Sequence, residues 1–176
     1  ISGSVTWKNG DTVPNAGNVS AVWVFTPDDA EYQAVEGVIT VTVYKATPEV
    51  MNVPKTEDRV YHPAVTLTNS DLICDASVVV YEGDEVPGTW TWQASNIVPV
   101  VNNSGYVAVF TPEDRVNYEI VTITVPMTVV KATPVIKSIS ATDIKSGRAL
   151  RESVLSGTVE YSDSDNTRVA GSFAWK

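Results

Sequence analysis

The segment GSVTWK at residues 3–8 returns as GTWTWQ at residues 88–93 and as GSFAWK at residues 171–176. The successive separations are 85 and 83 residues. In each copy an apolar residue lies two positions before a tryptophan. Side chains alternate between the two faces of a strand, so this pair shares one face. The segment therefore predicts a strand whose tryptophan points into a core.

Other segments recur in the same register. FTP at residues 25–27 matches residues 110–112 at a separation of 85, and KATP at residues 45–48 matches residues 131–134 at a separation of 86. Chance does not supply this many matches in one register. A period of this length fits a compact β-sandwich domain that is repeated along the chain.

The KATP segment predicts the boundary between successive domains, because its proline cannot donate to a continuing ladder. Cutting there makes residues 1–47 the second half of one repeat, residues 48–133 a complete repeat and residues 134–176 the first half of another. On this interpretation the chain starts and ends at the same point of the cycle. Short connectors would then keep the two halves of one molecule apart, and halves from different molecules would combine by half-domain exchange into a swapped dimer or an open chain. The rival expectation is that the boundaries lie elsewhere and that each span of about 85 residues, starting at GSVTWK or its match, closes on itself as a sandwich.

Alternation dominates the periodic segments and predicts antiparallel strands with one apolar face. Ile39, Val41 and Val43 alternate with threonines, and the matching residues Val125, Met127 and Val129 alternate with Pro126 and Thr128. Pro126 interrupts the second copy, so we expect a sheet edge or a bulge there. Residues 143–155 are the best helix candidate, but they align with a segment that contains His62-Pro63. Because proline is unfavourable inside a helix, we expect no helix there. The same parity places all five tryptophans inward, namely Trp7, Trp23, Trp90, Trp92 and Trp175.

The composition narrows the possible partners. Twelve Lys and Arg stand against 21 Asp and Glu, giving a formal charge of −9, which disfavours nucleic acid. The apolar runs are far shorter than the ~20 residues of a membrane-spanning helix, so no membrane-spanning segment is expected. The single cysteine, Cys74, excludes an intrachain disulfide and is interpreted as a small buried hydrophobe.

Four linked patterns resemble bacterial immunoglobulin-like repeats: LxxSxLSG at residues 150–157, VxGxFxW at residues 169–175, FTPxDxxxY at residues 110–118 and VxVxKATP at residues 41–48. Such repeats occur in tandem in large surface and secreted proteins, particularly adhesin-like ones. The resemblance implies an all-β fold of tandem immunoglobulin-like antiparallel β-sandwich domains. It also implies an extracellular or bacterial cell-surface location, neighbouring repeats as partners, and a spacer or stalk role.

No set of residues predicts catalysis or a cofactor. His62 is the only histidine, so a Ser-His-Asp triad or a histidine-based zinc site would depend on it alone. Asp29 and Asp114 recur beside the FTP motif and are interpreted as turn residues, with calcium binding as the alternative. Residues 162–166 are rich in oxygen ligands, and Asp163, Asp165 and Asn166 are weak calcium candidates in what is otherwise an acidic, solvated loop.

Two further pairs recur. Tyr32 and Tyr118 follow the FTP turn and resemble a tyrosine corner, whose hydroxyl bonds to nearby backbone. Lys45 and Lys131 lie at the predicted junctions. Lysines in some surface immunoglobulin-like domains form isopeptide crosslinks, but a solvated lysine at a strand end is the expectation here.

The leading functional hypothesis is therefore a non-catalytic structural spacer. The alternative is a module that binds a glycan or a host protein through its inter-strand loops at residues 9–18, 82–87 and 95–104. Exposed aromatic side chains would favour sugar stacking, whereas the predicted inward tryptophans do not. An enzyme is the least supported class, because no catalytic constellation converges.

Overall fold

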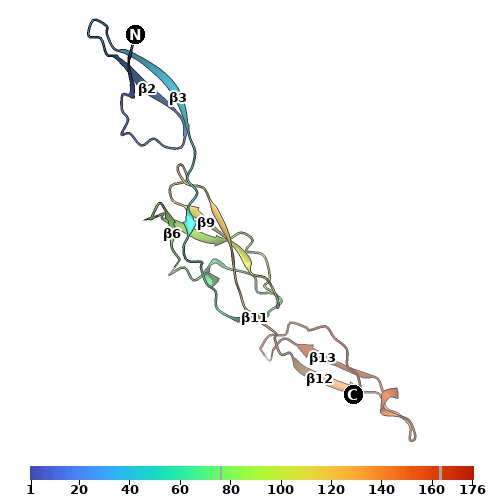
Figure 1. Ribbon diagram of the computed structural model, residues 1–176. Helices are drawn as coiled ribbons and strands as arrows, with labels where there is room; N and C mark the ends of the chain where they lie inside the picture. The colour runs from blue at the N-terminus through green and yellow to red at the C-terminus, as the bar shows by residue number, and fades with distance from the viewer. Residues whose placement is uncertain (76, 163) are drawn as a thin grey trace. The chain divides into compact units, whose positions relative to one another are not determined.

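The computed structural model describes residues 1–75, 77–162 and 164–176 (Figure 1). It is an all-β protein, as expected, and the described residues contain no α-helix. They also contain no helix that is long and apolar enough to cross a membrane. The strands are β1 (Gly3–Trp7), β2 (Gly17–Pro27), β3 (Val35–Val43), β4 (Glu49–Val50), β5 (Arg59–Val60), β6 (Val79–Tyr81), β7 (Asp84–Glu85), β8 (Gly88–Trp92), β9 (Tyr106–Pro112), β10 (Val121–Val125), β11 (Val129–Val130), β12 (Val135–Ala141) and β13 (Leu155–Glu160), and the 3₁₀ turns are η1 (Asn69–Asp71) and η2 (Leu150–Glu152).

The chain forms two compact units. The first combines Ile1–Lys55, Leu72–Gln93 and Tyr106–Val125, and the second combines Thr56–Asp71, Ala94–Gly105 and Pro126–Lys176. Residues 48–133 contribute to both units. The boundaries expected at residues 47 and 133 therefore stay a prediction.

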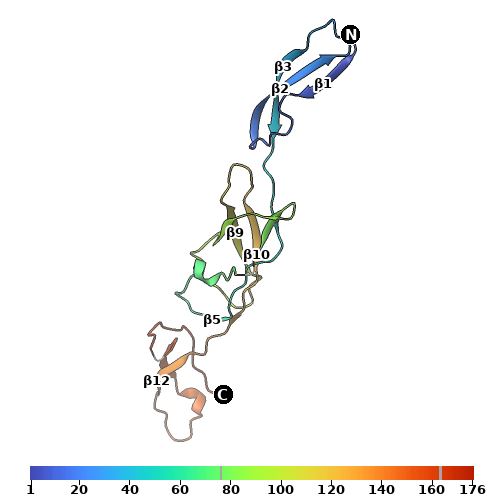
Figure 2. The same ribbon diagram turned by 90° about the vertical axis from the view of Figure 1, so that its left-hand side faces the viewer.

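The first unit begins with an antiparallel sheet in the order β1-β2-β3 (Figure 2). Trp7 lies opposite Trp23 in this sheet, and Ala21 lies opposite Ile39. Because opposite residues share a face, alternate positions build one continuous apolar face. We call this surface the apolar face of β1-β2-β3. Its members are Val5, Trp7, Val19, Ala21, Trp23, Phe25, Val35, Ile39 and Val41.

The expectation that every tryptophan is buried is wrong for two of the five. Trp7 is 52% exposed on the apolar face of β1-β2-β3, and Trp175 is 41% exposed near the end of the chain. Trp92, which matches both, is only 5% exposed. Parity correctly places these rings on one face of a strand, but it does not decide whether a second layer covers that face.

A second antiparallel sheet, ordered β10-β9-β8, does have its apolar side covered. Phe110 of β9 packs with Val79 and Val86 in one buried cluster. Val79 belongs to β6, which lies in the sheet β4-β6-β7, so side chains from two antiparallel sheets meet in this cluster. Trp90 and Tyr118 pack against its margin.

Pro126 ends β10 after Val125, as its missing N–H requires. Here β10 is an edge strand, as expected. Beyond the proline, β11 pairs in parallel with β5 instead. Val125, Met127 and Val129 are nevertheless all buried, so the inward series predicted from alternation is confirmed here. The matching β3 runs unbroken to Val43.

The second unit contains the hairpin β12-β13, which repeats the pairing of β4 with β6. Val50 lies opposite Val79 in the first pair, and Ile136 lies opposite Val159 in the second. A backbone bond from Val86 to the Val79 carbonyl, of 2.8 Å, has its equivalent between Val169 and Val159, at 2.9 Å. Residues 135–169 thus reproduce the local structure of residues 49–86.

The matched residues Trp92 and Trp7 test whether the apolar faces of the two sheets differ in how far a second layer buries them. We expect Trp92→Ala to lower the free energy of unfolding by about 3–5 kcal/mol, because it empties a buried site. Trp7→Ala should cost less than half as much, since about half of that ring already faces water. Urea unfolding followed by far-ultraviolet circular dichroism measures both. Equal losses would contradict the difference in cover.

Candidate functional site

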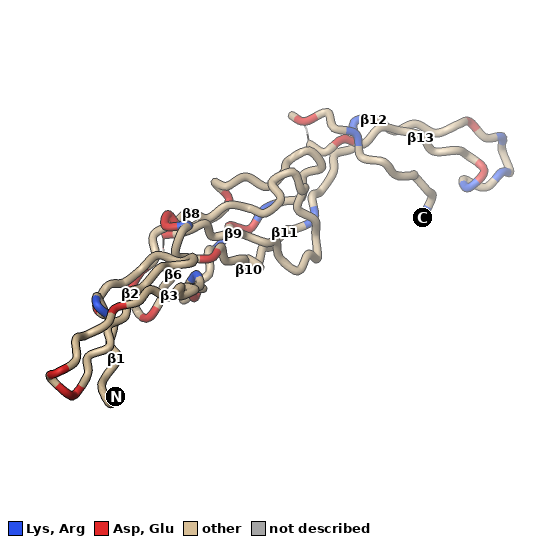
Figure 3. The backbone as a smooth tube through the Cα atoms, turned by 90° about the horizontal axis from the view of Figure 1, so that it is seen from above, with Lys and Arg blue, Asp and Glu red and all other residues tan. Residues whose placement is uncertain are grey.

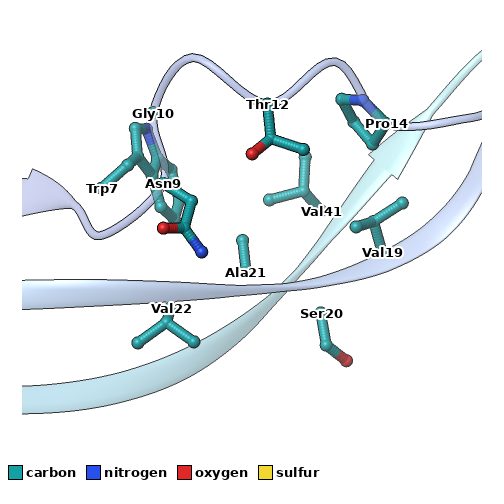
Figure 4. Close-up of a pocket in the computed structure, with 10 residues that line it drawn as sticks. All are labelled: Trp7, Asn9, Gly10, Thr12, Pro14, Val19, Ser20, Ala21, Val22 and Val41. Atoms are coloured by element: carbon teal, nitrogen blue, oxygen red, sulfur yellow. The ribbon is translucent and has the colours of Figure 1, made fainter.

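A hollow of about 320 Å³ lies on the apolar face of β1-β2-β3, beneath the loop that follows β1. Figure 4 shows Val19, Ala21 and Val41 pointing toward this loop, while Val22 points to the other side of the sheet. The loop and the end of β1 supply Trp7, Asn9, Gly10, Thr12 and Pro14. The hollow therefore combines an apolar floor with one indole ring, one amide and one hydroxyl.

The carboxamide of Asn117 joins the β1-β2-β3 segment to the turn that follows β9. Its Oδ1 accepts a 2.8 Å bond from the Ala16 amide, and its Nδ2 donates to Asn15 Oδ1 at 3.0 Å. The same Nδ2 donates to Asp114 Oδ2 at 2.8 Å. The Asn117 side chain thus bonds to the Ala16 backbone amide, to the Asn15 side chain and to the Asp114 side chain of its own turn.

The KATP linker is held by the same turn. The Ala46 amide donates to the Asn117 carbonyl at 2.7 Å, and the Glu119 amide donates to the Ala46 carbonyl at 2.8 Å. Lys45 Nζ donates to the Arg115 carbonyl at 2.6 Å. This linker is therefore paired to defined backbone groups. We call the contacts of Asn117, Lys45 and Ala46 the junction.

Asp114 and Asp29 have the turn role that their recurrence predicts. Asp114 Oδ1 accepts the amides of Val116 and Asn117, each at 3.0 Å, and Asp29 Oδ1 accepts the Glu31 amide at 3.0 Å. The hydrogen bonds from Asn117 are the main reason that the pKa of Asp114 lies below its ordinary value, with a smaller contribution from the charge of Lys45. An ionised Asp114 does not supply the proton that an isopeptide condensation needs. Lys45 is exposed, as expected for a lysine at a strand end, but its amine is also bonded to the Arg115 carbonyl.

The tyrosine-corner prediction is wrong in its key bond. The backbone amides of Tyr32 and Tyr118 donate to the carbonyls of Asp29 and Asp114, both at 3.2 Å. Within the described residues neither hydroxyl forms the expected bond to backbone. The Tyr118 ring instead meets the Tyr81 ring edge-on, with 5.9 Å between centroids.

His62 has a partner that the sequence did not reveal. Its Nε2 lies 2.7 Å from Asp165 Oδ2, and its Nδ1 accepts the Ala64 amide at 3.1 Å. The Tyr161 ring packs edge-on against the imidazole, with 4.4 Å between centroids. Both ring nitrogens are therefore engaged, and neither faces a nucleophile as a catalytic histidine would. The geometry is that of a structural clasp between residues that are 103 positions apart.

The weak calcium candidates stay a prediction, because one of them lies outside the described residues. Asp163 lies outside the described residues. Asp165 uses one oxygen for His62 and the other for the Thr167 amide, at 2.9 Å. Among the residues that the structure describes, no three His, Cys, Asp or Glu side chains gather in a metal-binding group. Among the described residues, Asn166 shares no hydrogen bond with the carboxylate of Asp165.

Cys74 is partly buried, and its thiol lies 3.7 Å from the Leu72 carbonyl. Burial raises the pKa of this thiol, and the neighbouring charge of Asp75 raises it further. A raised pKa keeps the sulfur protonated at neutral pH, so it is a poor nucleophile.

Comparison with protein-family models, with curated proteins and with solved structures finds no match for this chain.

The junction predicts a site-specific change in protease sensitivity. Asn117→Ala removes bonds worth about 0.5–1.5 kcal/mol each, so tryptic cleavage after Lys45 should accelerate by roughly 2–10-fold. Cleavage after the matching Lys131 supplies the internal control and should keep its rate. Mass spectrometry of timed digests resolves the two cuts. Acceleration at both lysines would mean general destabilisation and would contradict a local role.

The clasp predicts a low titration midpoint for Asp165. Bonds from Thr167 and then from His62 lower the pKa of this carboxyl to about 2, against about 3.9 for an unperturbed aspartate. The stability that its charge adds is complete above about pH 4 and is lost as the pH falls through about 2.

Carboxyl chemical shifts measure that midpoint. His62→Ala should raise it only part of the way to the ordinary value, because the Thr167 bonds remain. An unchanged midpoint in His62→Ala would show that the pair does not interact.

Proposed function

We propose that this chain is a non-catalytic structural spacer made of tandem immunoglobulin-like β-sandwich repeats. We place it in a bacterial cell-surface or secreted adhesin-like protein, where it holds a binding module away from the surface. The observation that carries the proposal is the junction. A linker at the predicted boundary is bonded to the turn of the next repeat through Ala46, Asn117 and Glu119.

A spacer needs connectors that transmit orientation, and a paired linker loses the freedom that a solvated linker keeps. The bridge between Ala46 and Tyr118 adds a short parallel pairing at the same point. Asn117 clamps residues 15–16 beside it. These contacts support a stiff connection on the first side of residues 48–133.

Two observations support the immunoglobulin-like part of the proposal. Side chains from the sheets β4-β6-β7 and β8-β9-β10 share the cluster of Val79, Val86 and Phe110, as the two layers of a sandwich do. The pairing of β12 with β13 repeats that of β4 with β6. Repeated units of this size, joined end to end, suit an extended array.

The hollow beneath the β1 loop favours one alternative, which is binding of a glycan or a host protein. The loop at residues 9–18 was predicted to carry such a function, and Asn9, Thr12 and Trp7 do line the hollow. An indole with nearby amide and hydroxyl groups is suited to stacking and hydrogen bonding with a sugar.

Small-angle X-ray scattering tests the spacer. Further copies of residues 48–133 are inserted after residue 133 of the whole chain. The maximum dimension should rise by a constant increment for each insertion. The increment should be the same between about 50 mM and about 1 M salt, because the junction depends on short hydrogen bonds rather than on long-range charge. Dimensions that grow as the cube root of mass would contradict an extended spacer.

The same samples distinguish the alternative on a glycan array. Binding that is lost in Trp7→Ala and Asn9→Ala would favour the recognition module. A constant increment without glycan binding would favour the spacer.

A further inference from the structure

Most contacts of the junction use groups that both copies of the repeat possess. The amide and the carbonyl of Ala46 bond to the turn after β9 through backbone atoms, and the matching residue in the next linker is also an alanine, Ala132. Lys45 donates to the Arg115 carbonyl, and its match Lys131 has the same amine. These contacts position the linker, but they do not distinguish one repeat from another.

One side-chain contact does distinguish the two copies. Asn117 Nδ2 donates to Asn15 Oδ1 at 3.0 Å, and the match of Asn15 at a separation of 85 residues is Val100. Valine has no hydrogen-bonding atom in its side chain. Ala16 also bonds to Asn117, but through its backbone amide, which its match Val101 has as well. Among the junction contacts that the structure describes, the one at Asn15 therefore uses a group that the second copy lacks.

The second copy brings the same loop and linker positions together. Val101, Lys131 and Ala132 line one hollow in the second unit. Their matches in the first copy are residues 16, 45 and 46, which the turn after β9 contacts. Loop and linker thus form the same kind of surface in both copies. The difference between residues 15 and 100 changes the chemistry of that surface and not its construction.

The turn after β9 is sensitive to this difference because its neighbours fix the orientation of the Asn117 carboxamide. Its Oδ1 accepts the Ala16 amide at 2.8 Å, and its Nδ2 donates to the Asp114 carboxylate at 2.8 Å. A backbone N–H only donates and an ionised carboxylate only accepts, so the oxygen and nitrogen of the carboxamide cannot exchange places. The second hydrogen of Nδ2 is then directed to Asn15 and requires an acceptor there.

The matching turn, which follows β2, has a different side chain at this position. Glu31 stands where the second copy has Asn117, and the turn has one residue fewer. Figure 3 shows acidic residues in this turn, which are Asp28, Asp29 and Glu31. An ionised carboxylate does not donate, so the Glu31 side chain offers no hydrogen to an acceptor such as the Asn15 oxygen. The two turns therefore fit loops of different chemistry.

We propose that Asn117 selects which repeat can precede residues 48–133. It fits a loop with a hydrogen-bond acceptor at the position of Asn15, and it discriminates against a loop with valine there, as at Val100. Valine leaves one Nδ2 hydrogen without its protein acceptor, so the junction opens about 2–10-fold more often. Selection of this kind gives an array of unlike repeats a fixed order. The inference rests on the proposed spacer, because it names the partner that the first connection of the spacer accepts.

Amide hydrogen exchange of the whole chain, followed by nuclear magnetic resonance, measures how often the junction opens. Asn15→Val introduces the side chain that the second copy has at this position. The amides of Ala46 and Glu119, which donate across the junction, should then exchange about 2–10-fold faster. The Gln93 amide, which donates to the Val107 carbonyl, should keep its rate because it lies outside the junction.

Two further variants identify the contact. Asn18→Val is the matched control, since Asn18 is an exposed asparagine close in sequence whose Oδ1 accepts from Thr42 and not from the junction. It should leave the exchange of both junction amides unchanged. Asn117→Asp keeps the oxygen that accepts from Ala16 and removes both bonds that Nδ2 donates. Adding Asn15→Val to Asn117→Asp should therefore have no further effect.

Three outcomes would overturn the proposal. Unchanged exchange of the junction amides in Asn15→Val means that the Asn15 side chain is not recognised. Equal acceleration in Asn18→Val, or at Gln93, means that the chain loosens generally. An effect of Asn15→Val that persists in full beside Asn117→Asp means that another group recognises Asn15. Constant scattering increments together with unchanged exchange would overturn the selection alone, whereas dimensions that grow as the cube root of mass would overturn the spacer.

Discussion

A β-sheet with one apolar face is stable in water only when a second layer removes that face from solvent. This constraint organises the chain. Where the sheets β4-β6-β7 and β8-β9-β10 both contribute side chains, Phe110 and its neighbours are buried. Where β1-β2-β3 has no such layer, residues of the same types remain open to water. The sheets have similar strand patterns and differ in cover.

The junction meets a different requirement. A linker between two domains exposes backbone groups that must find partners in water or in protein. Here the amide and the carbonyl of Ala46 both form hydrogen bonds with the turn after β9. The side chain of Asn117 forms hydrogen bonds with residues 15–16. Because these partners are main-chain atoms in fixed positions, they restrict the direction in which the linker leaves. That restriction is what a spacer uses.

Much of the strand pattern was predictable, because it depends on neighbours in sequence. The period of two residues identified the inward series at Val125, Met127 and Val129, and the recurring FTP motif identified Asp114 as a turn residue. The exposure of Trp7 was not predictable, because alternation defines a face and not its cover. The clasp of His62 with Asp165 was hidden for another reason. Its members are 103 residues apart, so no local pattern in the sequence links them. Asn117 carried a partial signal, since the other copy has Glu31 at that position.

Pro126 has an effect beyond the ending of a ladder. The strand β3 is nine residues long, lies at the edge of its sheet and has the sequence VEGVITVTV. Its last six residues are all β-branched and uncharged, and such a run at an open edge is a template for intermolecular cross-β growth. In the matching stretch, Pro126 interrupts that template and β11 turns to another partner, β5. The proline therefore breaks this template in one copy, whereas the strand β3 of the other copy has Glu36 as its charged residue.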